Sequence, residues 1–387
     1  MKEIYKNVAF IPVRGGSTSI KKKNIKLING RPLVYWVLDA AAECKYIDKI
    51  FVSTDSDEIK STVEAYKNEK IKVIDRSKKV STDTASTEST MFEFAKEYDF
   101  ENMVLIQATS PLLTFKNLND GFEKFLKEDI DSVISVVRQK RFIWQEEKNT
   151  ILPQNYDPMN RPRRQDFNGF LIENGAFYIT SRESFMKEGC RISGKVGAVE
   201  MPQESYYEID EPLDWIIVEN LLKVRKAKKI GKIKALFMDC DGVLTDGGMY
   251  YSENGDELKK FNTKDGMGIE LLKNKGIITG IITGEKREIV RKRCEKLKIN
   301  ELHMGIKNKL SVIDSLIEKY ELTYEEIAYI GDDINDLEVI KKVGFGCAVR
   351  DSMEIIKNEA DYITKLDGGK GAVREVAEVI LEGSYNS

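Results

Sequence analysis

The pair of residues best suited to chemistry in this chain is Asp239 and Asp241, separated by Cys240 and followed by Gly242. The pair directly follows an apolar run, Ala235–Met238, which is typical of a buried strand. Residues i and i+2 of a strand point to the same face, so we expect the two carboxylates to converge. Like charges that close repel unless a cation or a shared proton relieves the repulsion. The pattern therefore predicts a nucleophile and a proton carrier beside a divalent metal.

Three further features follow the aspartates along the chain. Thr283 ends the apolar run that begins at Ile277, Lys309 opens a predicted helix, and Asp332 follows the apolar run 327–330. In an open parallel sheet, ligands bind outside the carboxyl ends of the strands. Since the aspartate pair, Thr283 and Asp332 follow predicted strands, and a helix start can lie beside strand ends, we expect all of them to share one site.

The residue types of this site indicate cleavage of a phosphate ester. The Asp239 carboxylate can attack phosphorus and form an aspartyl-phosphate. Asp241 can protonate the leaving alcohol and later activate water. Mg²⁺ prefers hard oxygen ligands, so Asp239, Asp332 and the carbonyl of Asp241 suit it. Thr283 and Lys309 would hold the phosphoryl oxygens as charge spreads in the transition state.

Two series of strands alternating with helices must position the functional residues. The first series begins with a strand at 8–13 and closes with a helix from Leu213 to about Lys229, and the second begins at Ile233. This alternation predicts an α/β fold with mostly parallel sheets. A chain of 387 residues is long enough for two domains, which we place at 1–228 and 229–387.

The region 233–383 resembles the haloacid dehalogenase (HAD) phosphatase superfamily in the order of its four motifs. It is similar to the small, cap-less branch typified by 3-deoxy-manno-octulosonate 8-phosphate phosphatase. This likeness is carried by the run 241–247, a hairpin expected at about 248–261, the run 262–268 and the tail 368–375. The resemblance implies a Rossmann-like sheet without a lid domain. It also implies a homotetramer in which a neighbouring subunit restricts the site, and a glycine-rich tail that helps to close it.

A glycine-rich loop in the first half has residue types suited to a nucleotide. The run Arg14–Ser17 leaves a predicted strand, and the basic run 21–23 with Asn24 follows. Consecutive glycines let backbone N–H groups approach a phosphate chain, while Arg14 and Lys23 would neutralise its charge. The spacing fits neither the P-loop nor the dinucleotide fingerprint. Taken alone, the loop is more commonly explained as a tight turn with solvent-facing lysines.

Further runs make the region 7–228 similar to the acylneuraminate cytidylyltransferase family. They are 52–56, Arg76 with 81–87, 105–112, 164–166 with 174–179, and 208–215. The resemblance implies a second Rossmann-like domain with a nucleotidyltransferase sheet. It implies that CTP and a 2-keto sugar acid give a CMP-sugar and pyrophosphate, with Mg²⁺ and cations stabilising the in-line transition state.

By motif position, this resemblance assigns roles to individual residues. The triphosphate would be bound by Arg14, Gly15, Ser17, Lys23 and Asn24. The cytosine would lie near Arg76, and the sugar acid would face Gln107, Arg164 and Asn174. Arg164 can pair with the carboxylate of that acid. Glu208 and Asp210 would hold Mg²⁺, because residues i and i+2 of a strand share a face; a surface acidic turn is the alternative.

Composition limits the compartment and the partners. A net charge of -3, with 41% hydrophobic and 32% charged residues, fits a globular protein and gives no reason to expect a nucleic acid. The five scattered cysteines favour free thiols in a reducing cytoplasm. The single histidine, His303, excludes a Ser-His-Asp triad. We expect a cytoplasmic protein without a membrane partner, because no apolar stretch reaches membrane-spanning length and the N-terminus opens with charges.

The two resemblances together predict a bifunctional enzyme. The second domain would remove the phosphate from a nonulosonate (sialic-acid-type) 9-phosphate, and the first would activate the free keto sugar acid with CTP. One alternative keeps both activities but makes 3-deoxy-manno-octulosonate the substrate. The loop 14–17 together with Arg164 and Asn174 favours nonulosonates over it. Another alternative keeps an active cytidylyltransferase and gives the HAD domain a role in oligomerisation alone.

Overall fold

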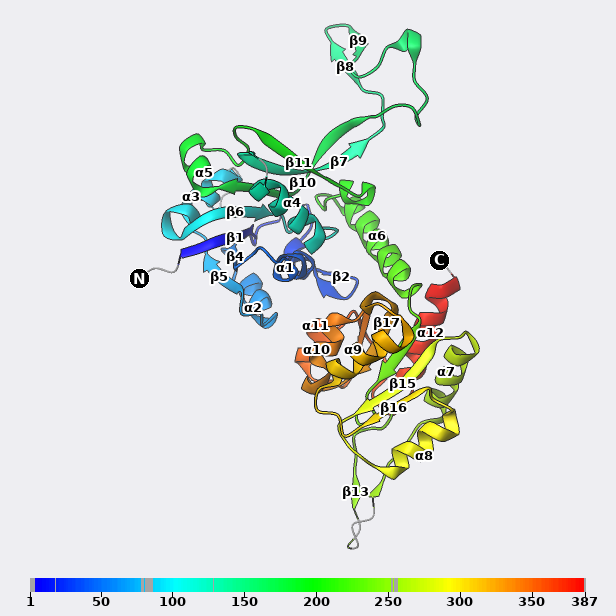
Figure 1. Cartoon of the computed structure of the whole chain (residues 1–387). Helices are drawn as coiled ribbons and strands as arrows, with labels where there is room; N and C mark the ends of the chain where they lie inside the picture. Colours follow the sequence, from blue (N-terminus) through cyan, green and yellow to red (C-terminus); the bar gives the residue numbers. More distant parts are fainter. Residues whose placement is uncertain are drawn as a thin grey trace. The chain divides into compact units, whose positions relative to one another are not determined.

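The computed structural model describes residues 4–17, 19–77, 80, 86–127, 129–251, 253 and 257–385. Thr18 and the run 81–85, which belong to the nucleotide motifs predicted above, lie outside these residues. The chain forms two compact units, 1–222 and 223–387, which divide within helix α6 (Pro212–Ile230). Each unit contains a central sheet with helices on both faces (Figure 1), so the predicted α/β class is confirmed.

The sheet of the first unit has seven strands in the order β11-β7-β10-β6-β1-β4-β5. The strands are β1 (Ile4–Pro12), β4 (Lys49–Thr54), β5 (Ile71–Asp75), β6 (Asp99–Ile106), β7 (Ser132–Gln139), β10 (Phe170–Ser181) and β11 (Val196–Met201). Strand β10 runs antiparallel to both of its neighbours, and the other described pairings of this sheet are parallel. The prediction of a mostly parallel sheet is therefore confirmed.

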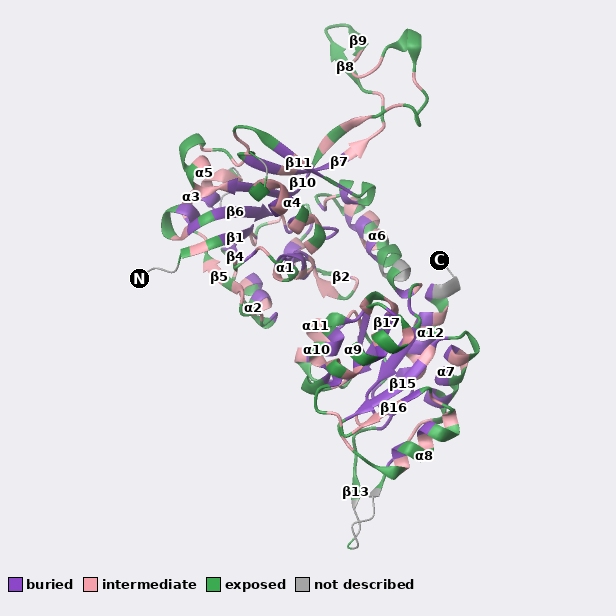
Figure 2. Cartoon of the chain, viewed as in Figure 1, coloured by how far each residue is buried: buried purple, intermediate pink, exposed green. Residues whose placement is uncertain are grey.

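Helices cover both faces of this sheet, which explains why its central strands are continuously apolar. One face packs against α1 (Leu33–Glu43), α2 (Asp57–Ala65) and α4 (Phe115–Lys127), and the other against α3 (Thr87–Glu97) and α5 (Arg182–Glu188). On β1, Ala9 and Ile11 face the first group, whereas Val8 and Phe10 face the second. Buried residues accordingly follow these strands in Figure 2.

Short elements complete the first unit. Two hairpins, β2–β3 (Leu27–Ile28 and Arg31–Pro32) and β8–β9 (Trp144–Glu147 and Thr150–Pro153), pair outside the main sheet. The β8–β9 hairpin projects from the sheet in Figure 1. The 3₁₀ turns are η1 (Lys23–Ile25), η2 (Pro158–Asn160) and η3 (Gln203–Tyr206).

The sheet of the second unit has six strands in the order β16-β15-β12-β17-β18-β19, and all of its described pairings are parallel. The strands are β12 (Ala235–Met238), β15 (Ile278–Thr283), β16 (Glu301–Met304), β17 (Ile327–Gly331), β18 (Phe345–Ala348) and β19 (Tyr362–Ile363). Five of them follow the apolar runs of the sequence. The sixth, β16, was missed because its residues, Glu-Leu-His-Met, are half polar.

Helices also cover both faces of this second sheet. One face packs against α7 (Thr263–Asn274), α8 (Glu288–Leu297) and α12 (Ala372–Tyr385), and the other against α9 (Lys309–Tyr320), α10 (Leu337–Lys342) and α11 (Glu354–Glu359). Short 3₁₀ turns lie at η4 (Tyr324–Glu326) and η5 (Ile334–Asp336). The expected hairpin forms as β13 (Tyr250–Tyr251) and β14 (Glu257–Leu258) between β12 and α7. No helix of the described residues has the length and apolar content needed to cross a membrane.

Candidate active sites

The carboxyl ends of three neighbouring strands bring polar residues of the second unit together. Asp239 follows β12, Thr283 ends β15 and Asp332 follows β17, while Lys309 is the first residue of α9. The side chain of Lys309 is fully buried. The parallel register fixes this arrangement, since Met238 lies opposite both Ile281 and Ile330 in the sheet.

Lys309 makes ion pairs with two buried aspartates. Its Nζ lies 2.9 Å from Asp239 Oδ2 and 2.7 Å from Asp336 Oδ1. Asp336 also accepts hydrogen bonds from the Tyr329 hydroxyl (2.5 Å) and from the Asp332 backbone N–H (3.0 Å). The sequence analysis did not single Asp336 out, because its role depends on the side chains that reach it in the folded chain.

Asp239, Asp332 and Asp336 form an acidic cluster in which one ligand oxygen of each lies within 4.8 Å of the others. Burial, followed by the charges of Asp239 and Asp336, raises the pKa of Asp332 to about 8. Burial and the charge of Asp336 also raise the pKa of Asp239. Among the described residues, Asp332 Oδ1 is buried without a hydrogen-bond partner. Repelling carboxylates with an unpaired oxygen fit a hard divalent cation.

Asp241 takes a different cation as its partner. Strand β12 ends at Met238, so both aspartates lie beyond the strand, and the expected i, i+2 convergence does not apply. The Asp241 Oδ1 accepts a hydrogen bond of 2.5 Å from Lys259, whose Nζ also lies 3.0 Å from Glu285 Oε2. The side chain of Asp241 is not part of the acidic cluster described above.

The C-terminal segment packs against the loop that carries Asp241. The backbone N–H of Gly369 donates to the carbonyl of Val243 (2.9 Å). A Cβ at Gly368 would lie 1.7 Å from the carbonyl oxygen of Gly242, so only glycine permits this approach. Asp265 anchors the following helix, α12, by accepting a bond from the Arg374 backbone N–H (3.0 Å). The tail thus braces the loop of its own chain.

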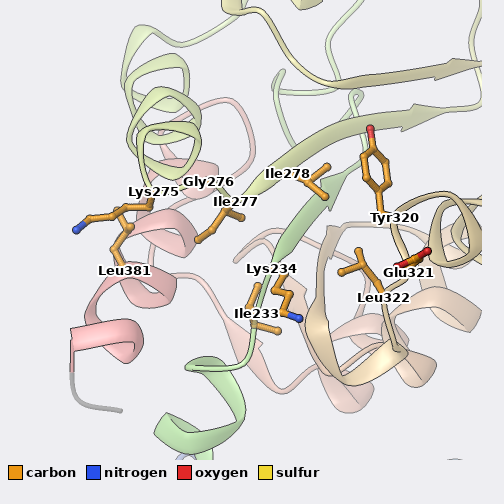
Figure 3. A pocket seen from close by; sticks show the side chains of 10 residues that line it. All are labelled: Ile233, Lys234, Lys275, Gly276, Ile277, Ile278, Tyr320, Glu321, Leu322 and Leu381. Carbon is orange, nitrogen blue, oxygen red and sulfur yellow. The ribbon is translucent and has the colours of Figure 1, made fainter.

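A cavity of about 480 Å³ lies at the opposite end of the same sheet (Figure 3). Its lining includes Lys234 and Ile278 near the amino ends of β12 and β15, together with Tyr320 at the end of α9 and Leu322 shortly after it. None of the candidate catalytic, substrate-binding or metal-binding residues lines it. The cavity is therefore separate from the chemistry at the carboxyl edge.

In the first unit, Lys23 contacts the predicted metal-binding segment. Its Nζ lies 2.9 Å from the carbonyl oxygen of Ile209 and 3.1 Å from Asp210 Oδ1. Burial, followed by the charge of Asp210, raises the pKa of Glu208 to about 7 against the opposing effect of Lys23. Glu208 and Asp210 lie in a loop between η3 and α6. The prediction that they lie on a strand was therefore wrong. Even so, Lys23 pairs with Asp210, and its charge also opposes the rise in the pKa of Glu208.

The glycine-rich loop after β1 is held by Asp55 and Asn24. The Gly15 backbone N–H donates to Asp55 Oδ1 (2.8 Å), and the Asn24 side chain donates to the carbonyl of Arg14 (3.1 Å). Asn24 is buried, so this side chain braces the loop. Ser17 is half-buried in the same loop.

Arg76 interacts electrostatically with Arg14 of this loop and with Asp55, which holds the loop. Its Nε donates to the carbonyl of Val80 (2.8 Å). Burial lowers the pKa of Arg76, the charge of Asp55 raises it and the charge of Arg14 lowers it. The predicted triphosphate and cytosine residues therefore share one region of the first unit.

The residues predicted to face the sugar acid divide into two groups. A Cβ at Gly175 would lie 2.9 Å from Glu208 Oε2 and 3.7 Å from Gln107 Oε1, which places Gln107 and Glu208 beside the same part of β10. Asn174 is buried there, and its Nδ2 donates to the carbonyl of Ser205 (2.8 Å). Among the described residues, Asn174 Oδ1 is buried without a partner. Arg164 instead lies exposed in a turn at 164–166 after the β8–β9 hairpin, and its role stays a prediction.

Comparisons with known proteins match both units of the chain. A model of the cytidylyltransferase family matches residues 8–167, and a model of haloacid dehalogenase-like hydrolases matches 301–375. The 3-deoxy-D-manno-octulosonate 8-phosphate phosphatase KdsC of Escherichia coli K12 is 44% identical over 153 residues, which are 40% of this chain and 81% of that protein. The chain therefore joins a cytidylyltransferase to a phosphatase of the HAD type.

Relatives that match along both units identify the family. The N-acylneuraminate cytidylyltransferase of Oncorhynchus mykiss is 35% identical over 96% of this chain and 88% of its own length. N-acylneuraminate cytidylyltransferase A of Danio rerio is likewise 35% identical over the same shares. The chain belongs to the N-acylneuraminate cytidylyltransferase family.

Proposed function

We propose that the chain catalyses two consecutive steps on one sugar acid. The phosphatase unit would hydrolyse a nonulosonate 9-phosphate, and the cytidylyltransferase unit would join the free keto acid to CTP, giving a CMP-sugar and pyrophosphate. The observation that carries this proposal is the match of relatives named for N-acylneuraminate along 96% of the chain, phosphatase unit included. Two consecutive steps on one sugar acid would explain why both sites occur in one chain.

In the phosphatase unit, Asp239 would be the nucleophile. Its carboxylate would attack phosphorus, and the P–O bond to the sugar alcohol would break as Asp241 protonates the leaving oxygen. Water, deprotonated by Asp241, would then cleave the aspartyl-phosphate. Thr283 and Lys309 would hold the phosphoryl oxygens, and the contact of Lys309 with Asp239 supports this position for the lysine.

Mg²⁺ would be held by Asp239, Asp332 and the carbonyl of Asp241. Asp336 would hold Lys309 and the backbone of Asp332 in place beside this site. The acidic cluster and the unpaired Asp332 oxygen support this site. When bound, the cation would neutralise the carboxylates and the developing charge on the phosphoryl group. Lys309 would remain beside Asp239 as the protein's own cation.

In the cytidylyltransferase unit, the loop after β1 would bind the triphosphate. Arg14, Gly15, Ser17, Lys23 and Asn24 would form or support this site, with Arg76 near the cytosine. Glu208 and Asp210 would hold a second Mg²⁺. The burial of Glu208 and its repulsion by Asp210 support the metal role over a plain surface turn. Gln107, Asn174 and Arg164 would bind the sugar acid, and the unpaired Asn174 oxygen supports a polar ligand there.

A second candidate substrate is an octulosonate 8-phosphate. The 44% identity of the phosphatase unit to KdsC, against 35% for the full-length relatives, favours testing it. The experiment offers the full-length chain each sugar phosphate with Mg²⁺ and measures orthophosphate, then offers each free acid with CTP and measures pyrophosphate. Release of both products from the nonulosonate series supports the proposal, and release from the octulosonate series alone would replace it.

We also propose that the chain forms a cytoplasmic homotetramer through the phosphatase unit. An inactive phosphatase unit that serves only this assembly is the rival reading. Sizing the full-length chain by light scattering, alongside the phosphate assay, separates the two. A tetramer without turnover on either sugar phosphate would favour the rival.

A further inference from the structure

Lys259 is a buried lysine that none of the predicted roles uses. It follows β14 of the hairpin and reaches back into the phosphatase site. Its side chain is only 1% exposed, whereas its partners Asp241 and Glu285 are 24% and 32% exposed. A buried cation of this kind persists only where opposite charges compensate it.

The contacts of Lys259 tie together three loops. Asp241 lies in the loop after β12, Glu285 lies in the loop after β15, and Lys259 itself ends the hairpin. The Lys259 Nζ contacts Asp241 Oδ1 at 2.5 Å and Glu285 Oε2 at 3.0 Å. Thr245 adds a weaker contact to the same Asp241 oxygen at 3.4 Å.

These contacts occupy one oxygen of Asp241, and none of them involves the other. Among the described residues, Asp241 Oδ2 is buried without a hydrogen-bond partner. The Lys259 side chain is buried, whereas both carboxylates are partly exposed, so a substrate would meet Asp241 and Glu285 first. A group in this place can orient the carboxylate that exchanges a proton without itself touching the substrate.

We propose that Lys259 is a positioning residue that fixes Asp241 for proton transfer to the leaving group and from the attacking water. This inference rests on the role proposed for Asp241. In the first step the Asp239 oxygen bonds to phosphorus, the bond from phosphorus to the alcohol breaks, and the Asp241 proton moves to the alcohol. In the second step water bonds to phosphorus, its proton moves to Asp241, and the bond from phosphorus to Asp239 breaks.

Leaving-group dependence separates positioning from a general structural role. Dinitrophenolate leaves without protonation, so the first step on 2,4-dinitrophenyl phosphate does not need Asp241, whereas a primary alkyl phosphate does. Hydrolysis of the aspartyl-phosphate needs Asp241 for both substrates. A displaced Asp241 therefore predicts slow turnover of both, with a first turnover that stays fast only for the dinitrophenyl ester.

The test compares Lys259→Met with Lys260→Met in the full-length chain with Mg²⁺. Lys260 is the exposed neighbour and serves as the matched control. For K259M we expect turnover of the alkyl phosphate to fall about 10²-fold or more, in line with the usual contribution of a general acid or base. Rapid mixing with dinitrophenyl phosphate should release about one dinitrophenolate per site in a burst before slow turnover. Pyrophosphate release from CTP by the other unit checks that the chain is intact.

Three results would overturn the proposal while wild-type phosphatase activity stands: unchanged K259M turnover, equal losses on both substrates without a burst, or the same defect in K260M. Absence of wild-type turnover on either phosphate ester would instead reject the proposed phosphatase function. If K259M does not fold, Lys259→Arg replaces it under the same criterion. A larger loss on the alkyl ester than in the first turnover of the dinitrophenyl ester supports positioning, and equal losses reject it.

Discussion

Lys309 and Asp336 form an ion pair in which neither side chain is exposed to solvent, with 2.7 Å between Nζ and Oδ1. The same lysine contacts Asp239 at 2.9 Å, so one cation compensates two buried carboxylates. Burial lowers the pKa of Lys309, but the charges of Asp336 and Asp239 outweigh it and raise the pKa overall. The lysine is therefore charged at neutral pH.

Replacing this lysine should damage stability and phosphatase activity together. Lys309→Met leaves two buried carboxylates without their cation, a type of change that destabilises by about 3–5 kcal/mol. We expect a lower unfolding temperature of the phosphatase unit by calorimetry without Mg²⁺, and loss of phosphate release. Lys307→Met is the matched control, because Lys307 is exposed and lies two residues before α9 begins. Equal unfolding temperatures for K309M and K307M would contradict the importance of the pair.

Asp239→Asn should have opposite effects on activity and stability. Removal of the nucleophile should lower phosphate release by about 10⁴-fold or more. Because repulsion from Asp336 and burial raise the pKa of Asp239, a neutral side chain should also stabilise the Mg²⁺-free unit. Phosphate release and calorimetry measure the two effects, and unchanged pyrophosphate release is the internal control. Unaltered phosphate release in D239N would show that another residue is the nucleophile.

The stability of the Mg²⁺-free phosphatase unit should depend on pH through Asp332. Its folded pKa, about 8, lies above the usual value of 3.8, so its contribution to stability is fully present below about pH 4 and is lost as pH rises through 8. Mg²⁺ binds the charged carboxylates, and its stabilising effect should therefore grow over the same range. The measurement is the unfolding temperature between pH 6 and 9, with and without Mg²⁺.

Two variants make this pH prediction specific. Asp332→Asn should weaken both the pH dependence and the stabilisation by Mg²⁺, since it removes the titrating group and a proposed ligand. Glu338→Gln, which neutralises an exposed carboxylate on α10, should behave like the wild type. If D332N keeps the full increase of Mg²⁺ stabilisation with pH, Asp332 does not hold the cation.

The sequence predicted the two α/β units and most strands because buried parallel strands are continuous apolar runs. It did not predict β16, whose Glu301 and His303 are polar. Glu301 is nevertheless buried, and it accepts hydrogen bonds from Lys319 and Tyr320 that compensate its burial. Such compensation depends on residues brought together only by folding. Local pattern carries no signal of it.

The candidate sites show the same division. Asp239, Thr283 and Asp332 could be placed from the strands they follow. The partners Asp336 and Lys259 could not, because their roles depend on which carboxylate each side chain reaches across the site. The argument that Asp239 and Asp241 share one face of a strand was wrong, because the strand ends at Met238. In the structure each aspartate pairs with a different lysine.

Glu208 should produce an acid limb in the pH profile of the cytidylyltransferase. Its pKa of about 7 means that the carboxylate is charged only above that pH, and a charged carboxylate is required to hold Mg²⁺. Pyrophosphate release should therefore rise through pH 7, and higher Mg²⁺ should move the limb to lower pH by competing with the proton. Glu208→Gln should remove the limb at much lower activity. Glu211→Gln, in the same segment, is the exposed control, and an identical limb in E208Q would contradict the assignment.

Arg164 is the predicted partner of the sugar-acid carboxylate, although it is exposed in the turn at 164–166. Loss of a hydrogen bond to a charged group weakens binding by about 1.5–3 kcal/mol, which corresponds to roughly 10- to 150-fold in an equilibrium constant. We therefore expect Arg164→Ala to raise the KM for the keto sugar acid by about this factor, with the KM for CTP unchanged. Arg163→Ala, an exposed arginine one position earlier, is the matched control. Steady-state pyrophosphate release with either substrate varied gives both constants, and equal KM values for R164A and R163A would place the carboxylate elsewhere.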